Sequence, residues 1–356
     1  MSKLNNVKVS RDGKTWEVEV KAEIPADVLA HYRDAALKEM QKTAKLDGFR
    51  AGKVPQERII EVYGETAVMR SAAEHAIQHE LPELMAAEKV LIIESPKVTT
   101  DTPASGKPLS FTARAALAPE VELADYKAIA KEHMSGKAEV AVSDEEHKET
   151  MTHLKRERAR IDKIEKGTEP QKAAEEARAM EEKDLPELDD DFVKALGYES
   201  AEVFSQKLRE NIKSEKEARE RDVRRAAMLD ELAEKSVIHY PAALKEYELD
   251  DMEARVKSDI ERTGGTFEQY LAQIKKTREE MRGEWSDAAD KRAKVRLVLS
   301  EIARKEKIEA GTERLEKEIE QAKKHVPNAD PEVLRAHIAH ALGNEWVLKW
   351  LESLQT

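Results

Sequence analysis

The spacing of helix-breaking residues is the feature that most limits the folds open to this chain. After Leu185, long segments rich in Glu, Lys and Arg are separated by a small set of breaking positions. These positions are Gly197, Tyr240-Pro241, Gly264-Gly265, Gly311 and Pro327. Long charged segments between such breakers predict helices, some of them folded back as hairpins. We therefore expect residues 184–356 to form a mainly α-helical domain with helical-hairpin arms.

The composition fits this expectation. Of the 356 residues, 40% are hydrophobic, 38% are charged and 4% are aromatic. That length is enough for about two domains, and the hydrophobic share permits real cores. A high charge content with few aromatic residues is typical of long helices that pair oppositely charged side chains and expose much surface. We expect this helical domain to be elongated.

The first 118 residues have a different pattern, which predicts an α+β domain. Alternating apolar residues on both sides of Asp12-Gly13 predict a hairpin with a tight primed turn. Apolar residues at three-to-four spacing predict helices after Pro25 and again from Ile59 to Leu84. Two further strands are expected at 90–93, continuing beyond Pro96, and at 109–117.

Three segments separate this domain from the helical one. Residues 119–142 lack sustained periodicity and are expected to be an extended linker. Ser143 with Glu146 three positions later forms a capping box, which predicts a helix over 143–166 that packs with the C-terminal domain. Residues 167–183 are a short Ala-, Glu- and Lys-rich segment.

The stretch Asp47 to Pro55 carries the chemistry of greatest interest. It combines an aromatic ring, Phe49, with two cations, Arg50 and Lys53, between glycines that permit a sharp turn. A planar guanidinium binds phosphate or carboxylate, an ammonium is a point charge, and a ring anchors in an apolar pocket. The alternative is an ordinary surface connector, because loops are commonly basic.

This stretch resembles the signature loop of the trigger factor family, Gly-Phe-Arg-x-Gly-Lys-x-Pro. The resemblance extends to about three quarters of the chain, including Val121-Glu122-Leu123, Leu185-Pro186-Glu187-Leu188 and the helix around Val295 to Ile308. It implies an ATP-independent chaperone that binds the large ribosomal subunit, through protein and RNA at the tunnel exit, and shields nascent polypeptides. The implied ribosome-binding residues are Gly48, Phe49, Arg50, Ala51, Gly52, Lys53, Val54 and Pro55.

One departure from the family pattern is large. Family members usually carry an FKBP-type prolyl isomerase domain between the connector and the helical domain. Here residues 167–183 occupy that place, too few for an independent domain. We therefore expect a chaperone without the isomerase module and without enzymatic activity.

A set of apolar residues around Gly264-Gly265 indicates an arm. The simplest interpretation is that they pack the two helices of a hairpin together; the alternative is that some of them bind varied unfolded clients, for which flexible Met side chains are suited. The candidate client-binding residues are Met252, Val256, Ile260, Phe267, Tyr270, Met281 and Trp285.

Other site classes find little support in the sequence. The chain has no cysteine and no nucleotide-binding or serine-hydrolase motif, so we expect no cofactor. His337 and His340 lie three apart, and acids gather at 187–191, but neither set has the ligand spacing of a zinc or calcium site, and we expect no metal. We expect neither a signal peptide nor a membrane span, and a cytoplasmic location.

Three alternatives remain open at this stage. The first is a charged helical scaffold that binds no client. The second is a holdase free of the ribosome, and the third is a prolyl isomerase with an unrecognised site. A weak homodimer is a further open possibility. With a formal charge of −12, contact with RNA requires a local basic patch.

Overall fold

The computed structural model describes residues 3–44, 46, 49, 52–135, 140–308, 311–326 and 330–354. The chain divides into two compact units. Unit 1 comprises Met1–Ala124 and Leu232–Leu348, and unit 2 comprises Asp125–Glu231 and Lys349–Thr356. Helices α8 and α13 each pass from one unit to the other, so these unit boundaries differ from the predicted domain boundaries.

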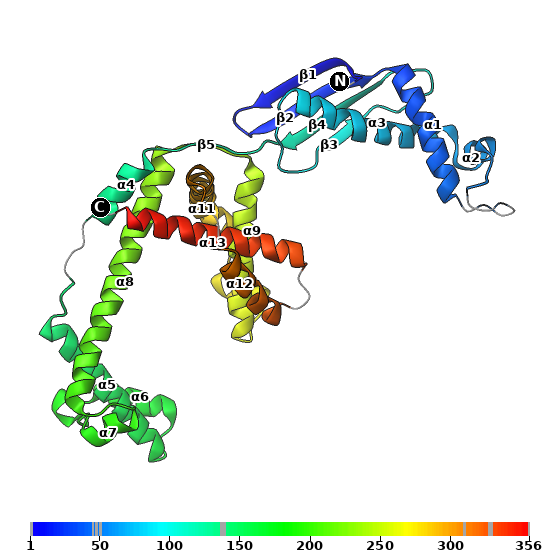
Figure 1. The fold of residues 1–356 in the computed structure, drawn as a ribbon. Coiled ribbons are helices and arrows are strands. Elements are labelled where there is room, and N and C mark those ends of the chain that lie inside the picture. The colour runs from blue at the N-terminus through cyan, green and yellow to red at the C-terminus, as the bar shows by residue number, and fades with distance from the viewer. Residues whose placement is uncertain are drawn as a thin grey trace. The chain divides into compact units, whose positions relative to one another are not determined.

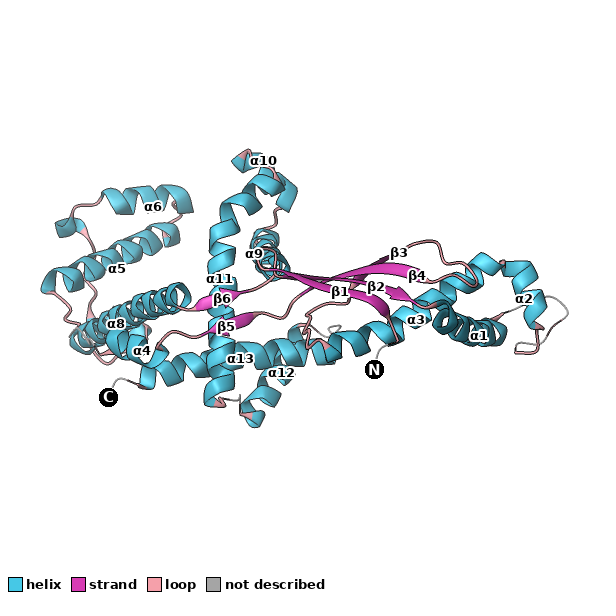
Figure 2. Ribbon diagram, turned by 90° about the horizontal axis from the view of Figure 1, so that it is seen from above, coloured by secondary structure: helices cyan, strands magenta, loops and turns pink. Residues whose placement is uncertain are grey.

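The N-terminal part of unit 1 is built on a four-stranded antiparallel sheet (Figures 1 and 2). Its order is β1-β2-β4-β3, so β1 and β3 are the edge strands. The strands are β1 (Asn5–Asp12), β2 (Glu17–Ile24), β3 (Lys97–Thr100) and β4 (Leu109–Ala116). This part also contains three helices: α1 (Ala26–Thr43), α2 (Gln56–Tyr63) and α3 (Glu65–Ala87).

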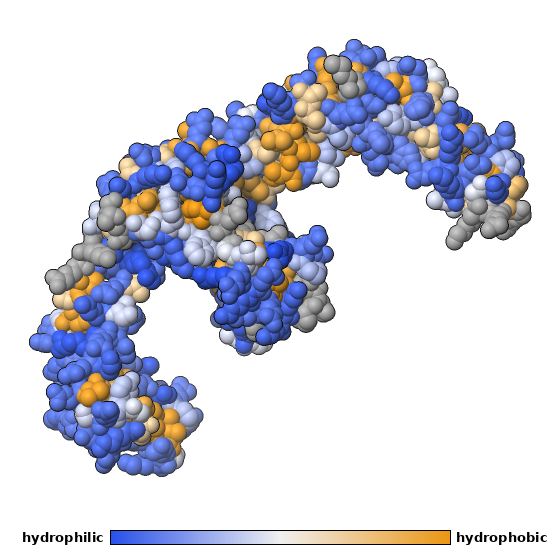
Figure 3. Space-filling view, in the orientation of Figure 1, coloured by the Kyte–Doolittle hydropathy of each residue, from blue (hydrophilic) through white to orange (hydrophobic). Residues whose placement is uncertain are grey.

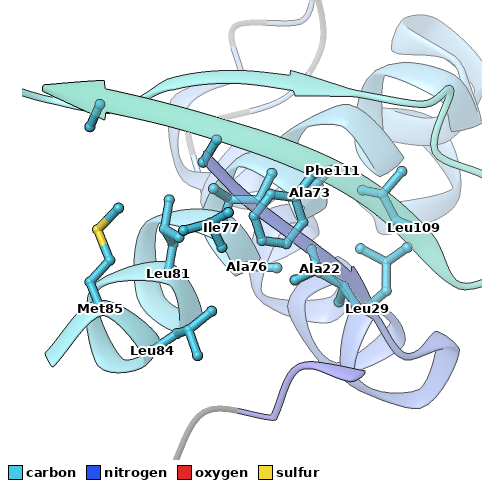
Figure 4. Close-up of a cluster of buried hydrophobic side chains, with 14 of the residues drawn as sticks. Ala22, Leu29, Ala73, Ala76, Ile77, Leu81, Leu84, Met85, Leu109 and Phe111 are labelled. Atoms are coloured by element: carbon cyan, nitrogen blue, oxygen red, sulfur yellow. The ribbon is translucent and has the colours of Figure 1, made fainter. Parts of the chain in front are cut away.

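Alternation of buried and more exposed residues along β2 and most of β4 creates the core of this part. In β2, Val18, Val20, Ala22 and Ile24 are buried, while the residues between them are more exposed. Val20 pairs with Ala113 and Ala22 pairs with Phe111, so both strands present their apolar side chains to the same face. Figure 4 shows Ile77, Leu81 and other side chains of α3 meeting this face. Burial of one helix face on one sheet face is the predicted α+β arrangement.

The β1–β2 connection differs from the predicted tight turn. It spans four residues, 13–16, and the positive φ falls on Trp16 (55°) and not on Gly13. The Asp12 carboxylate accepts the Lys14 amide at 2.8 Å, so Asp12 caps a wider loop. The Trp16 conformation is retained because its indole stacks on His239, with ring centroids 4.8 Å apart, and donates to the Ala118 carbonyl at 2.8 Å.

The strand predicted at 90–93 and beyond Pro96 is regular only in its second part. Residues 90–93 contain a single bridge, between Ile92 and Leu117, and the regular strand β3 begins at Lys97. Leu91 and Ile93 are exposed, so an apolar run here does not form a buried strand.

The helical pattern that continues past Gly64 consists of two helices. Gly64 lies between them with φ of 83°, a conformation that strains any other residue, and its amide donates to the Ile60 carbonyl. The chain therefore changes direction between α2 and α3.

The segment predicted as an extended linker contains a short strand and a helix. Strand β5 (Glu120–Glu122) pairs antiparallel with β6 (Val237–His239) in a separate two-stranded ribbon. Helix α4 (Tyr126–Met134) then begins at Asp125, whose carboxylate accepts the Ala128 amide. The expectation of extended structure over the whole of 119–142 was wrong, because four apolar residues at helical spacing are buried: Tyr126, Ile129, Ala130 and Met134.

The remaining elements of unit 2 are helical. They are α5 (Asp144–Glu165), α6 (Pro170–Ala179), the 3₁₀ turn η1 (Glu182–Asp184), α7 (Asp190–Ala195) and most of α8 (Ala201–Lys235). The capping box predicted at Ser143 and Glu146 is confirmed. Helix α6 occupies most of the short segment 167–183 and packs on α5 through Ala159, Ala177 and Leu185.

Unit 1 is completed by helices from the second half of the chain. They are α9 (Ala242–Arg262), α10 (Phe267–Ile274), α11 (Arg278–Glu306), α12 (Thr312–His325) and α13 (Pro331–Ser353), the last ending in unit 2. Helices α9 and α11 pack together as a hairpin joined through α10. The fold class, an α+β N-terminal part followed by a mainly helical part with a helical hairpin, is confirmed.

Candidate functional sites

The second half of the predicted signature loop is anchored in a small core. Val54 is fully buried in a cluster with Leu37, Ile59 and Val68 from the three helices around it. Pro55 follows immediately and precedes the first residue of α2. A buried residue next to the first residue of a helix fixes where the exposed part of the loop begins.

Gln41 on α1 holds the same part of the loop by two hydrogen bonds. Its side-chain amide donates to the Val54 carbonyl at 2.5 Å, and its own carbonyl accepts the Gly52 amide at 3.1 Å. Gly52 has φ of 79°, a conformation that strains any other residue. The loop is therefore attached to α1 by backbone and side chain together.

Among the described residues of the loop, the exposed side chains include an aromatic ring and an ammonium. Phe49 is 41% exposed although its amide donates to the Leu46 carbonyl, and Lys53 is exposed and forms no ion pair with any described residue. Gly48, Arg50 and Ala51 lie outside the described residues. An exposed ring and an exposed ammonium in one loop suit binding to a partner surface better than packing within the chain.

Sequence reasoning missed two further features near this loop. Lys38 and Lys42 are exposed on α1, one helical turn apart and close in sequence to its end. Their spacing of four was a signal that would have identified a basic stripe. The role of Gln41 had no sequence signal, since it depends on the path of the loop.

The seven candidate residues of the arm divide by exposure. Phe267 and Met281 are buried, so they pack the hairpin. Five are half-buried: Met252, Val256, Ile260, Tyr270 and Trp285. The Lys257 ammonium lies 4.8 Å from the centre of the Phe267 ring and covers one of its faces.

Ion pairs join the two long helices of the hairpin. On α9, the Glu253 side chain is 4% exposed and contacts Arg278 at 2.9 Å and Arg282 at 2.8 Å, both on α11. Glu248, also buried, contacts Arg292 and Arg296 at 3.1 and 3.0 Å. These contacts place charges where a hydrophobic core would otherwise hold the helices together.

The environment of Glu253 favours its charged form. Burial alone would raise its pKa, but hydrogen bonds from Lys257, Arg278 and Arg282 outweigh that effect and lower the pKa to about 2. Arg282 has the complementary shift: burial opposes its charge, yet the hydrogen bonds that it donates to Glu246, Asp250 and Glu253 raise its pKa. Glu253 and Arg282 are therefore both charged at neutral pH.

The acids at 187–191 act as structural caps and pairs. The Asp189 carboxylate accepts the Phe192 amide at the start of α7, Asp190 accepts the Ala201 amide, and Glu187 pairs with Lys155. The side chains of His337 and His340 lie outside what the structure describes. Among the described side chains, no group of three or more His, Asp or Glu is placed to hold a metal ion.

The visible surface in Figure 3 is mostly hydrophilic, with hydrophobic side chains in separate areas. No helix among the described residues is long and apolar enough to cross a membrane.

Comparison with known protein families agrees with these features. Residues 5–154 match the family model described as bacterial trigger factor protein, and residues 200–339 match the model for its C-terminus. The chain belongs to the trigger factor family. The two matches lie on either side of residues 155–199, where α6 and α7 are found.

Trigger factors from several bacteria are similar over most of their length. The protein of Caldicellulosiruptor bescii is 25% identical over 86% of this chain and 85% of its own length. The protein of Halothermothrix orenii is 25% identical over 90% of this chain and 91% of its own. The first alignment runs over 382 residues, longer than the whole chain, so that relative has residues that this trigger factor lacks.

A solved structure shares the fold. It is described as "Promiscuous Substrate Recognition in Folding and Assembly Activities of the Trigger Factor Chaperone". The two chains superpose with a TM-score of 0.52 at 16% identity, covering 97% of this chain and 99% of the other. This likeness supports the fold of the trigger factor family, whose members are molecular chaperones.

Proposed function

We propose that this trigger factor is an ATP-independent chaperone of the cytoplasm that docks beside the ribosomal exit tunnel through residues 48–55. The main support for the proposal is that one part of the loop is anchored in the domain and another part is exposed. Val54 and Gln41 fix it to the domain, while Phe49 and Lys53 remain exposed. A rigid attachment reduces the entropy that is lost when the exposed groups bind.

The two exposed groups suit two kinds of partner surface. The Phe49 ring fits an apolar pocket on a protein of the large subunit, where buried aromatic anchors contribute most of the binding energy. Lys53, with Arg50 in the same loop and the Lys38–Lys42 stripe on α1, attracts RNA phosphates. Binding to RNA through such a local patch is compatible with the net charge of −12.

The arm then contacts emerging polypeptide. Because ion pairs hold α9 against α11, the half-buried Met252, Val256 and Trp285 are not all required to close the hairpin. Dispersed and partly exposed apolar side chains bind unfolded segments weakly, which allows release and folding without ATP.

No enzymatic activity is included in this proposal. Between the matched N- and C-terminal regions lie the end of α5, α6 and α7, and α6 packs on α5 through an alanine-rich contact. A peptide isomerisation assay on a prolyl substrate tests this point, and turnover above the uncatalysed rate contradicts it.

Co-sedimentation with bacterial ribosomes tests the docking. The test variant combines Phe49→Ala, Arg50→Ala and Lys53→Ala. The matched control combines Lys14→Ala and Lys107→Ala, which remove two exposed positive charges from turns of the same domain. We expect loss of ribosome association in the test variant alone.

A second assay separates docking from chaperone activity. Both variants should suppress aggregation of a denatured client in the absence of ribosomes as well as the intact protein does. Equal ribosome association by all three proteins favours a holdase that binds ribosomes by another surface. Association by none of them favours a holdase that is free of the ribosome. Failure of all three to suppress aggregation favours the scaffold alternative.

A further inference from the structure

The free edge of the four-stranded sheet has backbone groups that face away from the rest of the sheet. Strand β3 pairs with β4 alone, and all four of its residues, Lys97–Thr100, are exposed. The register matches Val98 with Ala113 and Thr100 with Phe111. An exposed strand edge is a template on which another extended chain can pair.

The hydrogen-bonding direction of each β3 residue follows from the register. The Asp101 amide donates to the Ser110 carbonyl, so Asp101 and Ser110 form a hydrogen-bonded pair. Hydrogen-bonded and non-bonded pairs alternate along antiparallel strands, so Thr99 also bonds to β4, whereas Val98 and Thr100 do not. Val98 and Thr100 therefore present their N–H and C=O groups to the free edge.

A groove runs beside this edge. It has a volume of about 460 Å³ and lies between α3 and β3. Ala73 and Ile77 of α3, together with Val98, form its apolar floor, and Figure 4 shows Ala73 and Ile77 on the side of α3 that meets the sheet. Because side chains alternate along a strand, Val98 and Thr100 lie on the same face as the buried Ala113 and Phe111.

The rim of the groove carries charges. Glu74 from α3 and Asp101 after β3 contribute two carboxylates against one guanidinium, from Arg70. A basic side chain next to apolar ones complements this arrangement. Pro96 and Pro103 bracket the edge, so only a short segment of partner can pair with it.

We propose that β3 and α3 form a binding site for an extended segment of unfolded polypeptide, which adds a fifth strand to the sheet. The segment alternates apolar side chains, which enter the groove, with polar ones, at least one of them basic. Its backbone exchanges hydrogen bonds with Val98 and Thr100. This inference rests on the proposed chaperone function and adds a second client site, in the domain that also carries the docking loop.

The probe is a fluorescent nine-residue peptide in which valine alternates with threonine and lysine. Val98→Pro is the test variant, because proline at 98 removes an outward N–H and no bond to β4. Val98→Thr is the matched control, since it keeps the N–H and the β-branched shape. A second peptide of the same sequence, N-methylated at alternate residues, cannot pair through its backbone.

Fluorescence anisotropy measures the affinity of the peptide, and NMR measures amide exchange in β3 and β4. We expect the peptide to bind the intact protein and Val98→Thr about equally, and Val98→Pro about tenfold more weakly. Bound peptide should slow exchange at Val98 and Thr100, and the N-methylated peptide should not bind. Unchanged exchange at the β4 amides that bond to β3 shows that Val98→Pro is folded.

Three outcomes overturn the proposal: no peptide binding, equal binding by Val98→Pro, or protection of Val98 and Thr100 that depends on protein concentration and not on peptide. The last result assigns the edge to a second copy of the chain. Ribosome co-sedimentation should be unchanged in Val98→Pro. Loss of peptide binding at β3 can therefore be distinguished from loss of ribosome binding by the docking loop.

Discussion

The replacement Glu253→Gln tests whether ion pairs, more than apolar contacts, hold the arm together. The Glu253 side chain is 4% exposed, and its pKa is lowered from the ordinary value of 4.5 to about 2. Since one pKa unit corresponds to about 1.4 kcal/mol, this shift represents roughly 3 kcal/mol of stabilisation of the folded arm at neutral pH. Arg282 retains Glu246 and Asp250 as partners in the variant, so the loss falls at the low end of the range for a broken buried pair, roughly 3 kcal/mol.

Hydrogen exchange at the amides of α9 and α11 measures this loss, because exchange there reports local opening of the arm. We expect opening roughly 100-fold more frequent at pH 7 in Glu253→Gln, since 1.4 kcal/mol is a factor of ten. Folding lowers the pKa of this carboxyl, so the stabilisation is present above pH 4.5 and is lost as the pH falls toward 2. The same difference between the two proteins should therefore persist at pH 6.

Glu246→Gln is the matched control. Glu246 contacts the same Arg282 at 2.8 Å, but its side chain is 62% exposed, and exposed pairs contribute less than about 1 kcal/mol. Exchange in this variant should rise by less than about fivefold. Equal effects of the two substitutions would refute the argument that burial makes Glu253 the main ionic contact of the hairpin.

Three further predictions concern the docking loop and the α5 cap. Val54→Ala should destabilise the α1–α2 region by roughly 2 kcal/mol, measured by hydrogen exchange in α2, because Val54 is fully buried; an unchanged exchange rate contradicts its anchoring role. Gly52→Ala should cost about 1 kcal/mol in the same assay, because alanine is strained at φ of 79°. Ser143→Ala should destabilise the first turn of α5 by about 1 kcal/mol, seen as faster exchange at Glu146, while Thr150→Ala, which leaves the cap intact, should not.

Local patterns in the sequence predicted most of the elements. The Ser143–Glu146 capping box depends on residues close together in the chain, and it marks the start of α5 in the structure. The break at Gly64 was not predicted, because the apolar spacing continues on both sides of it. The sequence also contains the signals that predict helix α4: Asp125 is an N-cap, and Tyr126, Ile129 and Ala130 follow at helical spacing. It was missed because short apolar stretches between two domains were interpreted as a linker.

Long-range contacts account for the features that the sequence did not predict. Trp16 adopts a positive φ because His239 and Ala118, far away in the chain, contact its indole. Glu253 pairs with Arg278 and Arg282, and no local rule selects these partners among the many charges of α11. For the docking loop, the sequence supplied Phe49 and Lys53, whereas its attachment through Gln41 required the structure.

Photo-cross-linking from position 49 tests the central proposal most directly. A photoreactive phenylalanine analogue at position 49 keeps the exposed ring, and the same analogue at Lys107, exposed in a turn of the same domain, is the control. After irradiation with bacterial ribosomes, we predict a cross-link from position 49 to a large-subunit protein at the tunnel exit and none from position 107. Stable ribosome association without any cross-link from position 49 would contradict docking through this loop.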